Sequence, residues 1–210
     1  MIGAGGHATV LASALNALGK VIYAVVSPEP PENRALFPDV IHFEYDSALT
    51  QLSPAEYILV NGIGAMPGNK LRIIIFQKFK ALGFDFMSII HPTAIVDQSV
   101  SIGEGVQILT RAIIQPGCII DDNAIINTGA IVEHDCHIGA FTHLAPGVAL
   151  SGGVTVGNYV HIGTNATVIQ GIKITERCII GAGVTINKNL DTAAIVYPAK
   201  SFIRSLGNEG

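Results

Sequence analysis

A six-residue period between Ala94 and Val184 constrains the fold of this 210-residue chain more than any other feature. Every sixth residue from Ala94 onward is Ala, Val, Ile, Cys or Thr. Two residues after each of these sixteen positions stands Val, Ile or Leu, from Val96 to Ile186. The two-residue alternation of ordinary strands does not maintain a six-residue register over such a length. The pattern therefore predicts a β-helix built from hexapeptide repeats.

The geometry of a β-helix predicts which residues stack on one another. Each hexapeptide forms one flat side and a corner, and three of them close a triangular coil. Residues eighteen apart then lie one strand spacing apart, ~4.8 Å. The period thus predicts that Cys118 stacks on Cys136 as a reduced thiol, and that His143 stacks on His161. Where glycine directly follows the aliphatic position, we expect corners that require a positive φ. These glycines are Gly103, Gly139, Gly157, Gly163 and Gly181.

The residues before the repeats follow a different pattern. Apolar residues at helical spacing predict helices over 7–20 and 69–83, and short apolar runs predict strands over 21–26, 56–62 and 84–90. Such alternation is typical of a small α/β unit with a parallel sheet, here Rossmann-like. We therefore divide the chain into an α/β domain over residues 1–90, a β-helix over 91–190 and a C-terminal tail over 191–210.

Composition excludes several classes of protein. Hydrophobic residues make up 49% of the chain and charged residues 13%, so an intrinsically disordered protein is excluded. A net charge of −4 gives no reason to expect a nucleic-acid partner. The chain has no apolar run long enough for a membrane span, and its start lacks the features of a signal peptide, so we expect a cytoplasmic protein. Three cysteines are too few for a disulfide scaffold.

Titratable residues gather in the segment IVEHDCHIGAFTH, residues 131–143, which holds three histidines and two acids. His134 and Asp135 fall at a predicted corner, outside the aliphatic ladder. A histidine can take a proton near neutral pH while a carboxylate fixes its tautomer and raises its basicity. The same pair also fits an ordinary solvated corner. His137 stands beside a core position, and we interpret it as structural.

The stretch GAGGHA, residues 3–8, fits the spacing G-x-G-x-x-A. A glycine turn that opens a helix presents free N–H groups that can hold a phosphate. The alternative is a tight strand-to-helix turn that binds no ligand. No acid stands clearly at the end of the predicted strand 21–26, where a full dinucleotide site would have one.

Several motifs together resemble one family of enzymes. They are GAGGHA near the start, SIIHPTAIV at residues 88–96, the stretch 127–153 from NTGAIVEHDC to LSGG, and PAK at 198–200. With the hexapeptides they are similar to the sugar O- and N-acyltransferases of the hexapeptide-repeat superfamily. The most similar members are the N-acetyltransferases that make UDP-N,N'-diacetylbacillosamine. The resemblance implies a left-handed, three-sided β-helix, a homotrimer, acetyl-CoA as acetyl donor and a UDP-amino-sugar as acceptor.

The resemblance also implies roles for individual residues. His134 matches the general base of the family, and Asp135 would hold its imidazole. Asn127 and His143 match positions beside the reacting groups. The residues expected to contact acetyl-CoA are His143, Asn127, Gly152, Ile162, Gly163, Gly181 and Gly183. The residues expected to contact the acceptor are Gly5, Gly6 and His7. His161 has no counterpart with a known role.

Two other functions remain open at this point. The enzyme could acetylate the oxygen or nitrogen of another sugar, such as a sialic acid or GDP-perosamine. Trimeric β-helices rich in histidine also occur among the gamma-class carbonic anhydrases, which hold zinc through three histidines from two subunits. Their pattern includes two histidines five apart, whereas the spacings here are three, six and eighteen. We therefore expect no metal.

Overall fold

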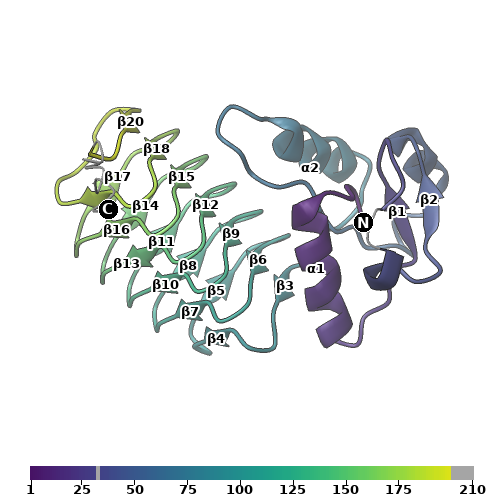
Figure 1. Cartoon of the computed structure of the whole chain (residues 1–210), viewed down its shortest axis with the longest axis horizontal. Helices are drawn as coiled ribbons and strands as arrows, with labels where there is room; N and C mark the ends of the chain where they lie inside the picture. Colours follow the sequence, from purple (N-terminus) through teal and green to yellow (C-terminus); the bar gives the residue numbers. More distant parts are fainter. Residues whose placement is uncertain (32–33, 200–210) are drawn as a thin grey trace, which may run out of the picture.

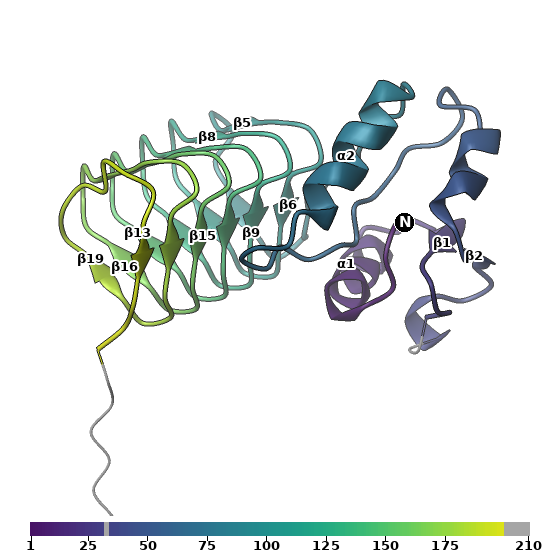
Figure 2. The same ribbon diagram turned by 90° about the horizontal axis from the view of Figure 1, so that it is seen from above.

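The computed structural model describes residues 1–31 and 34–199 and contains an α/β unit followed by a β-helix (Figure 1). The predicted tail over 191–210 lies partly outside the described residues. Seen from above, the coils of the β-helix stack along one axis, and α1 and α2 lie beyond one end of the stack (Figure 2). In the described part of the chain, no helix is both long and apolar enough to cross a membrane.

The β-helix consists of two-residue strands that recur every six residues up to Ile186, followed by one more strand. They are β3 (Ile89–Ile90), β4 (Ile95–Val96), β5 (Ser101–Ile102), β6 (Gln107–Ile108), β7 (Ile113–Ile114), β8 (Ile119–Ile120), β9 (Ile125–Ile126), β10 (Ile131–Val132), β11 (His137–Ile138), β12 (His143–Leu144), β13 (Ala149–Leu150), β14 (Thr155–Val156), β15 (His161–Ile162), β16 (Thr167–Val168), β17 (Lys173–Ile174), β18 (Ile179–Ile180), β19 (Thr185–Ile186) and β20 (Ile195–Val196). All pair in parallel, mostly with a strand eighteen residues away, and they form sheets of five, six and seven strands.

The aliphatic ladder fills the interior of the β-helix, as the six-residue period predicts. In every hexapeptide between Val106 and Val168, the Val, Ile or Leu that stands two residues after the repeat position is at most 1% exposed. Cys118 and Cys136 are buried free thiols, and their sulfur atoms lie 3.1 and 3.3 Å from the carbonyl oxygens of Glu133 and Ser151. β8 pairs in register with β11, which confirms the predicted stacking of Cys118 on Cys136. Each coil buries its apolar pair against the coils on either side.

The prediction about the five glycines is wrong. Gly103, Gly139, Gly157, Gly163 and Gly181 do not have a positive φ. They are small because the next coil passes close by: a Cβ atom at Gly139 would lie 2.6 Å from the carbonyl carbon of Gly157, and one at Gly163 would lie 2.6 Å from the nitrogen of Ala182. The positive φ falls two residues further along, where even bulky residues such as Phe141 and Tyr159 adopt it.

The N-terminal unit is the predicted parallel α/β arrangement, but its strands are short. Its elements are α1 (Gly6–Ala17), β1 (Ala24–Val26), the 3-10 helix η1 (Arg34–Leu36), β2 (Ile41–Phe43), the 3-10 helix η2 (Asp46–Gln51) and α2 (Leu71–Ala81). β1 pairs in parallel with β2, and Ile2 bridges both Val26 and Asn61. The strand predicted over 21–26 is shorter than expected, and Val21 is 92% exposed. The stretch 56–62 pairs only through single bridges. β2 was not predicted.

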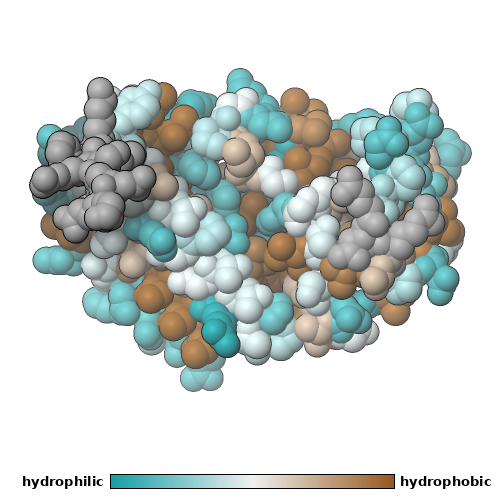
Figure 3. Space-filling view, in the orientation of Figure 1, coloured by the Kyte–Doolittle hydropathy of each residue, from teal (hydrophilic) through white to brown (hydrophobic). Residues whose placement is uncertain are grey.

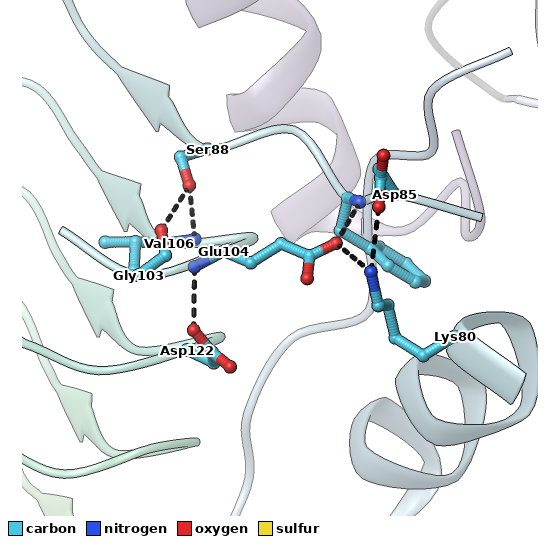
Figure 4. Close-up of polar contacts among 8 residues, drawn as sticks. Lys80, Asp85, Ser88, Gly103, Glu104, Val106 and Asp122 are labelled. Atoms are coloured by element: carbon cyan, nitrogen blue, oxygen red, sulfur yellow. Dashed lines mark hydrogen bonds and ion pairs between the residues drawn. The ribbon is translucent and has the colours of Figure 1, made fainter. Parts of the chain in front are cut away.

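Polar contacts join the N-terminal unit to the first coils (Figure 4). One carboxylate oxygen of Glu104 accepts hydrogen bonds from Lys80 Nζ at 2.8 Å and from the Phe86 N–H at 2.7 Å. The Glu104 N–H donates to Asp122 Oδ1 at 2.8 Å, and Lys80 also pairs with Asp85. Glu104 thus connects α2, the segment that leaves it, and the first coils of the β-helix.

Candidate active site

His134 and Asp135 occupy an exposed corner between β10 and β11. His134 Nδ1 lies 2.8 Å from Asp135 Oδ2, and the two side chains are 63% and 73% exposed. The corner is fixed because Asp135 adopts a φ of 58° and its N–H donates to the Pro116 carbonyl at 3.0 Å. The hydrogen bond to Asp135 raises the pKa of His134 above its ordinary value. With Nδ1 directed at the carboxylate, Nε2 is the nitrogen left to accept a proton.

Gly152 lies one coil away, directly against the His134 ring. A Cβ atom at Gly152 would be 2.5 Å from His134 Nε2 and 2.7 Å from its Cε1. The ring can therefore occupy this place only because residue 152 has no side chain. Within residues 1–31 and 34–199 the Gly152 N–H has no hydrogen-bond acceptor. The structure thus brings together a free imidazole nitrogen and a free backbone donor, as a general base and an oxyanion site require.

Asn127 and His143 form a second group at the seven-stranded sheet. His143 extends outward from β12, and its Nε2 lies 3.0 Å from Asn127 Nδ2. Its Nδ1 lies 3.0 Å from the carbonyl oxygen of Ala65. Burial, with a contribution from nearby His161, lowers the pKa of His143 to about 3. The ring is therefore neutral, donates from Nδ1 to Ala65 and accepts at Nε2 from Asn127.

The two groups do not meet within one chain. His134 follows β10 of the six-stranded sheet and precedes β11 of the five-stranded sheet. Asn127 follows β9, and His143 lies on β12, both in the seven-stranded sheet. The predicted catalytic pair and the predicted acetyl-binding pair thus lie at different corners of the triangular coil.

The predicted acceptor residues lie where the N-terminal unit meets the β-helix. Gly5 and Gly6 begin α1, and a Cβ atom at either would meet nothing within 4 Å, so both face open space. His7 Nε2 lies 2.7 Å from Gln107 Oε1 on β6, and burial lowers the pKa of His7 to about 4. Gln107 in turn donates to the Asn61 carbonyl at 2.8 Å. His7 therefore also ties the glycine turn to the β-helix.

The residues predicted to hold acetyl-CoA in the later coils offer backbone rather than side chains. Ile162 is fully buried in the core, so only its peptide groups can reach a ligand. A Cβ atom at Gly181 would lie 2.7 Å from Pro198 Cδ, whereas one at Gly183 would meet nothing within 4 Å. Lys200, the last residue of the PAK stretch, lies outside the described residues.

A pocket of about 380 Å³ lies beside the second group, between the loop that precedes α2 and the β-helix. Its lining residues are Ala65, Met66, Pro67, Gly68, Asn69, Lys70, Arg72, Ile73, Phe141, His143, Tyr159, Val160, His161, Arg177 and Ile179. Of these lining residues, His143 and His161 were singled out from the sequence, and the others were missed. Phe141, Tyr159 and Arg177 recur at an interval of eighteen, and that interval was the signal that they share one corner. Phe141 and Tyr159 stack with ring centroids 5.5 Å apart.

Arg72 is the buried cation of this region. It is 3% exposed, and its guanidinium donates to the carbonyls of Asn61, Ile63 and Asn123 at 3.0, 2.8 and 3.3 Å. It therefore binds the loop to the β-helix. Among the described residues, no three His, Cys, Asp or Glu side chains lie close enough to share a metal ion.

Comparison with known proteins agrees with this architecture. The family model for bacterial transferase hexapeptide repeats matches residues 99–134 and 153–188. The structure of PerB from Caulobacter crescentus, in complex with CoA and GDP-perosamine, is 39% identical, with a TM-score of 0.81 over 95% of this chain and 94% of that one. The acetyltransferase domain of PglB from Neisseria gonorrhoeae is 34% identical, with a TM-score of 0.80 over 96% and 97%. No curated protein sequence matches the chain.

The stacked hexapeptides and the match to the family model define a hexapeptide-repeat transferase. The extent and identity of the structural matches define it further, because they include the α/β unit as well as the β-helix. The chain belongs to the family of hexapeptide-repeat sugar acyltransferases.

Proposed function

We propose that the protein transfers the acetyl group of acetyl-CoA to the 4-amino group of a nucleotide-linked 4-amino-4,6-dideoxy sugar. A UDP-linked N-acetyl sugar of the bacillosamine type is the first acceptor to test. The observation that carries the proposal is the corner at which His134, held by Asp135, directs its free nitrogen toward Gly152. This arrangement suits direct transfer to an amine.

In the proposed mechanism the acceptor amine attacks the thioester carbonyl. His134 Nε2 takes the proton that the amine loses, while Asp135 holds Nδ1–H and stabilises the imidazolium. The Gly152 N–H donates to the oxyanion of the tetrahedral intermediate. The C–S bond then breaks, the His134 imidazolium gives its proton to the departing thiolate, and CoA leaves as its thiol. A covalent acyl-enzyme is not needed, and the three cysteines are buried free thiols.

We further propose that the active site forms between two subunits of a homotrimer. The groups around His134 and His143 lie at different corners of one coil, so a neighbouring subunit is needed to bring them face to face. A stripe of apolar side chains is available for such contact: Figure 3 shows them over β4, β7 and β10, where Ile95 is 65% and Ile131 37% exposed. An exposed apolar patch of this kind is typical of a protein interface.

The comparisons support acetyl-CoA as the acetyl donor more directly than they support any one acceptor sugar. PerB was solved with CoA and GDP-perosamine, and the PglB acetyltransferase domain with acetyl-CoA. Two further PerB structures carry one histidine replaced by asparagine or by alanine, and both are about as similar to this chain as the unsubstituted protein. The PerB complex makes GDP-perosamine the second candidate acceptor.

A panel of acceptors tests the proposal. Purified protein is incubated with acetyl-CoA and UDP-4-amino-4,6-dideoxy-N-acetylglucosamine, GDP-perosamine or free sialic acid, and the released thiol is followed. Thiol release with the UDP sugar supports the first candidate, and release with GDP-perosamine alone selects the second. Release with sialic acid alone would replace N-acetylation by O-acetylation. Stoichiometric zinc with CO₂ hydration and no thiol release would contradict acetyl transfer altogether.

A further inference from the structure

His161 is a second pocket histidine, and its ring nitrogens are free. It extends outward from β15, directly paired in register with His143, and the two rings meet edge to face with centroids 5.0 Å apart. Among the described residues neither ring nitrogen of His161 has a hydrogen-bond partner, and Nδ1 is sealed from solvent. Because His161 lines the pocket and its Nε2 is not sealed, this second nitrogen is open to a ligand.

His143 has no such free capacity. Its two nitrogens are occupied by Ala65 and Asn127, each at 3.0 Å. A ligand could bond to the His143 ring only by displacing one of these partners. The hydrogen bond to the Ala65 carbonyl fixes the loop that precedes α2, which extends toward the β-helix (Figure 1). The same loop forms one wall of the pocket.

The tautomer of His161 follows from its surroundings. Burial lowers the pKa of His161, so the ring is neutral and carries one N–H. A proton on the sealed Nδ1 would be a buried donor without an acceptor, which is rarer in proteins than an unpaired acceptor. The proton therefore resides on Nε2, and the ring presents a hydrogen-bond donor to the pocket.

We infer that His161 Nε2–H donates a hydrogen bond to an oxygen of the acceptor sugar nucleotide, and that His143 is a positioning residue that holds the loop. The inference rests on the proposed function. The acceptor is favoured over acetyl-CoA because the N-terminal unit supplies the facing wall, with Lys70 and Arg72, while Arg177 lies on the side of the β-helix. No acid stands among the described residues that line the pocket, which suits the charge of a nucleotide diphosphate.

Two substitutions at His161 test this assignment. His161→Phe keeps a flat ring against His143 but removes both nitrogens, and His161→Gln restores a donor. The matched control is His137→Phe, which removes an outward histidine of β11 that pairs with Asp121 on another face. We expect His161→Phe to raise the calorimetric Kd and the KM of the acceptor by about tenfold, the loss of one hydrogen bond. His161→Gln should recover part of this loss, and the KM of acetyl-CoA should stay unchanged in all three variants.

The outcomes separate the inference from the proposed function. If the wild type releases no thiol with any acceptor, both fail. If the wild type is active and His161→Phe binds the acceptor as tightly as wild type does, the inference alone is overturned. Nitrogen NMR of the wild-type histidines provides a check that requires no substitution. The inference expects His161 as the Nε2–H tautomer with an Nε2 signal that shifts when the acceptor is added, and an Nδ1–H tautomer or an unshifted signal overturns it.

Discussion

Substitution of Gly152 by alanine isolates the contact on which the proposed mechanism depends. The new Cβ atom would lie 2.5 Å from His134 Nε2 and 2.7 Å from Cε1, far inside van der Waals contact. Because the His134 side chain is 63% exposed, its ring can swing into solvent, and the fold should survive. The base then loses its position beside the reacting groups. A displacement of about 1 Å in an active site can cost ~10²-fold in rate, so we expect kcat to fall by about that factor.

The control for Gly152→Ala is the neighbouring glycine. Gly153 adopts a φ of 69°, and a Cβ atom there would meet only Gly171 Cα, at 4.0 Å. Gly153→Ala should therefore destabilise the protein by about 1 kcal/mol through backbone strain but retain kcat. Thiol release is measured for both variants together with thermal melting. The double variant Gly152→Ala/His134→Ala should be no slower than His134→Ala alone. Near-wild-type kcat in Gly152→Ala, or additive losses in the double variant, would refute the placement of the ring against Gly152.

Three further predictions follow from other parts of the structure. Asp135→Asn should reduce kcat by less than His134→Ala does, because the imidazole remains and only its orientation and basicity suffer; steady-state kinetics of both variants measure this. Ile131→Glu places a charge in the exposed apolar stripe and should yield monomers without thiol release, and light scattering that shows an active monomer would contradict a site between subunits. Glu104→Ala should lower the free energy of unfolding by about 1–3 kcal/mol, because it leaves the Phe86 N–H without its acceptor and Lys80 with Asp85 alone, and thermal melting should show Glu104→Gln to be milder.

The six-residue period predicted the β-helix well because each rung must bury an aliphatic pair. A shift of one residue would place Ile138 in solvent and His137 in the core, so the register from Ala94 onward follows from the sequence alone. The conformations of the corners did not follow in the same way. The glycines after the aliphatic positions are required by the neighbouring coil, and the positive φ two residues later is imposed even on Phe141.

The N-terminal unit and its contacts were harder to predict. Its strands are short and pair partly through single bridges, so local pattern overstated the strand over 21–26 and missed β2. The contacts that build the pocket join residues far apart in the chain: His143 reaches Ala65, 78 residues earlier, and His7 reaches Gln107, 100 residues later. By contrast, His134 and Asp135 are adjacent, and Gly152 is eighteen residues beyond His134. The coil repeat of eighteen residues is therefore enough to predict that these three residues lie together.

The pH dependence of thiol release tests the central claim most directly, with wild type and His134→Ala compared on the active acceptor. His134 must be neutral to take a proton, and its hydrogen bond to Asp135 raises its pKa above the ordinary value of a histidine. The wild-type kcat should therefore rise with pH through a group whose pKa lies above that of an ordinary histidine. General-base catalysis is worth about 10²–10⁴-fold, so His134→Ala should lose that factor and lack this limb, with little change in the affinity for acetyl-CoA. A variant that keeps near-wild-type kcat and the same limb would show that another group removes the proton.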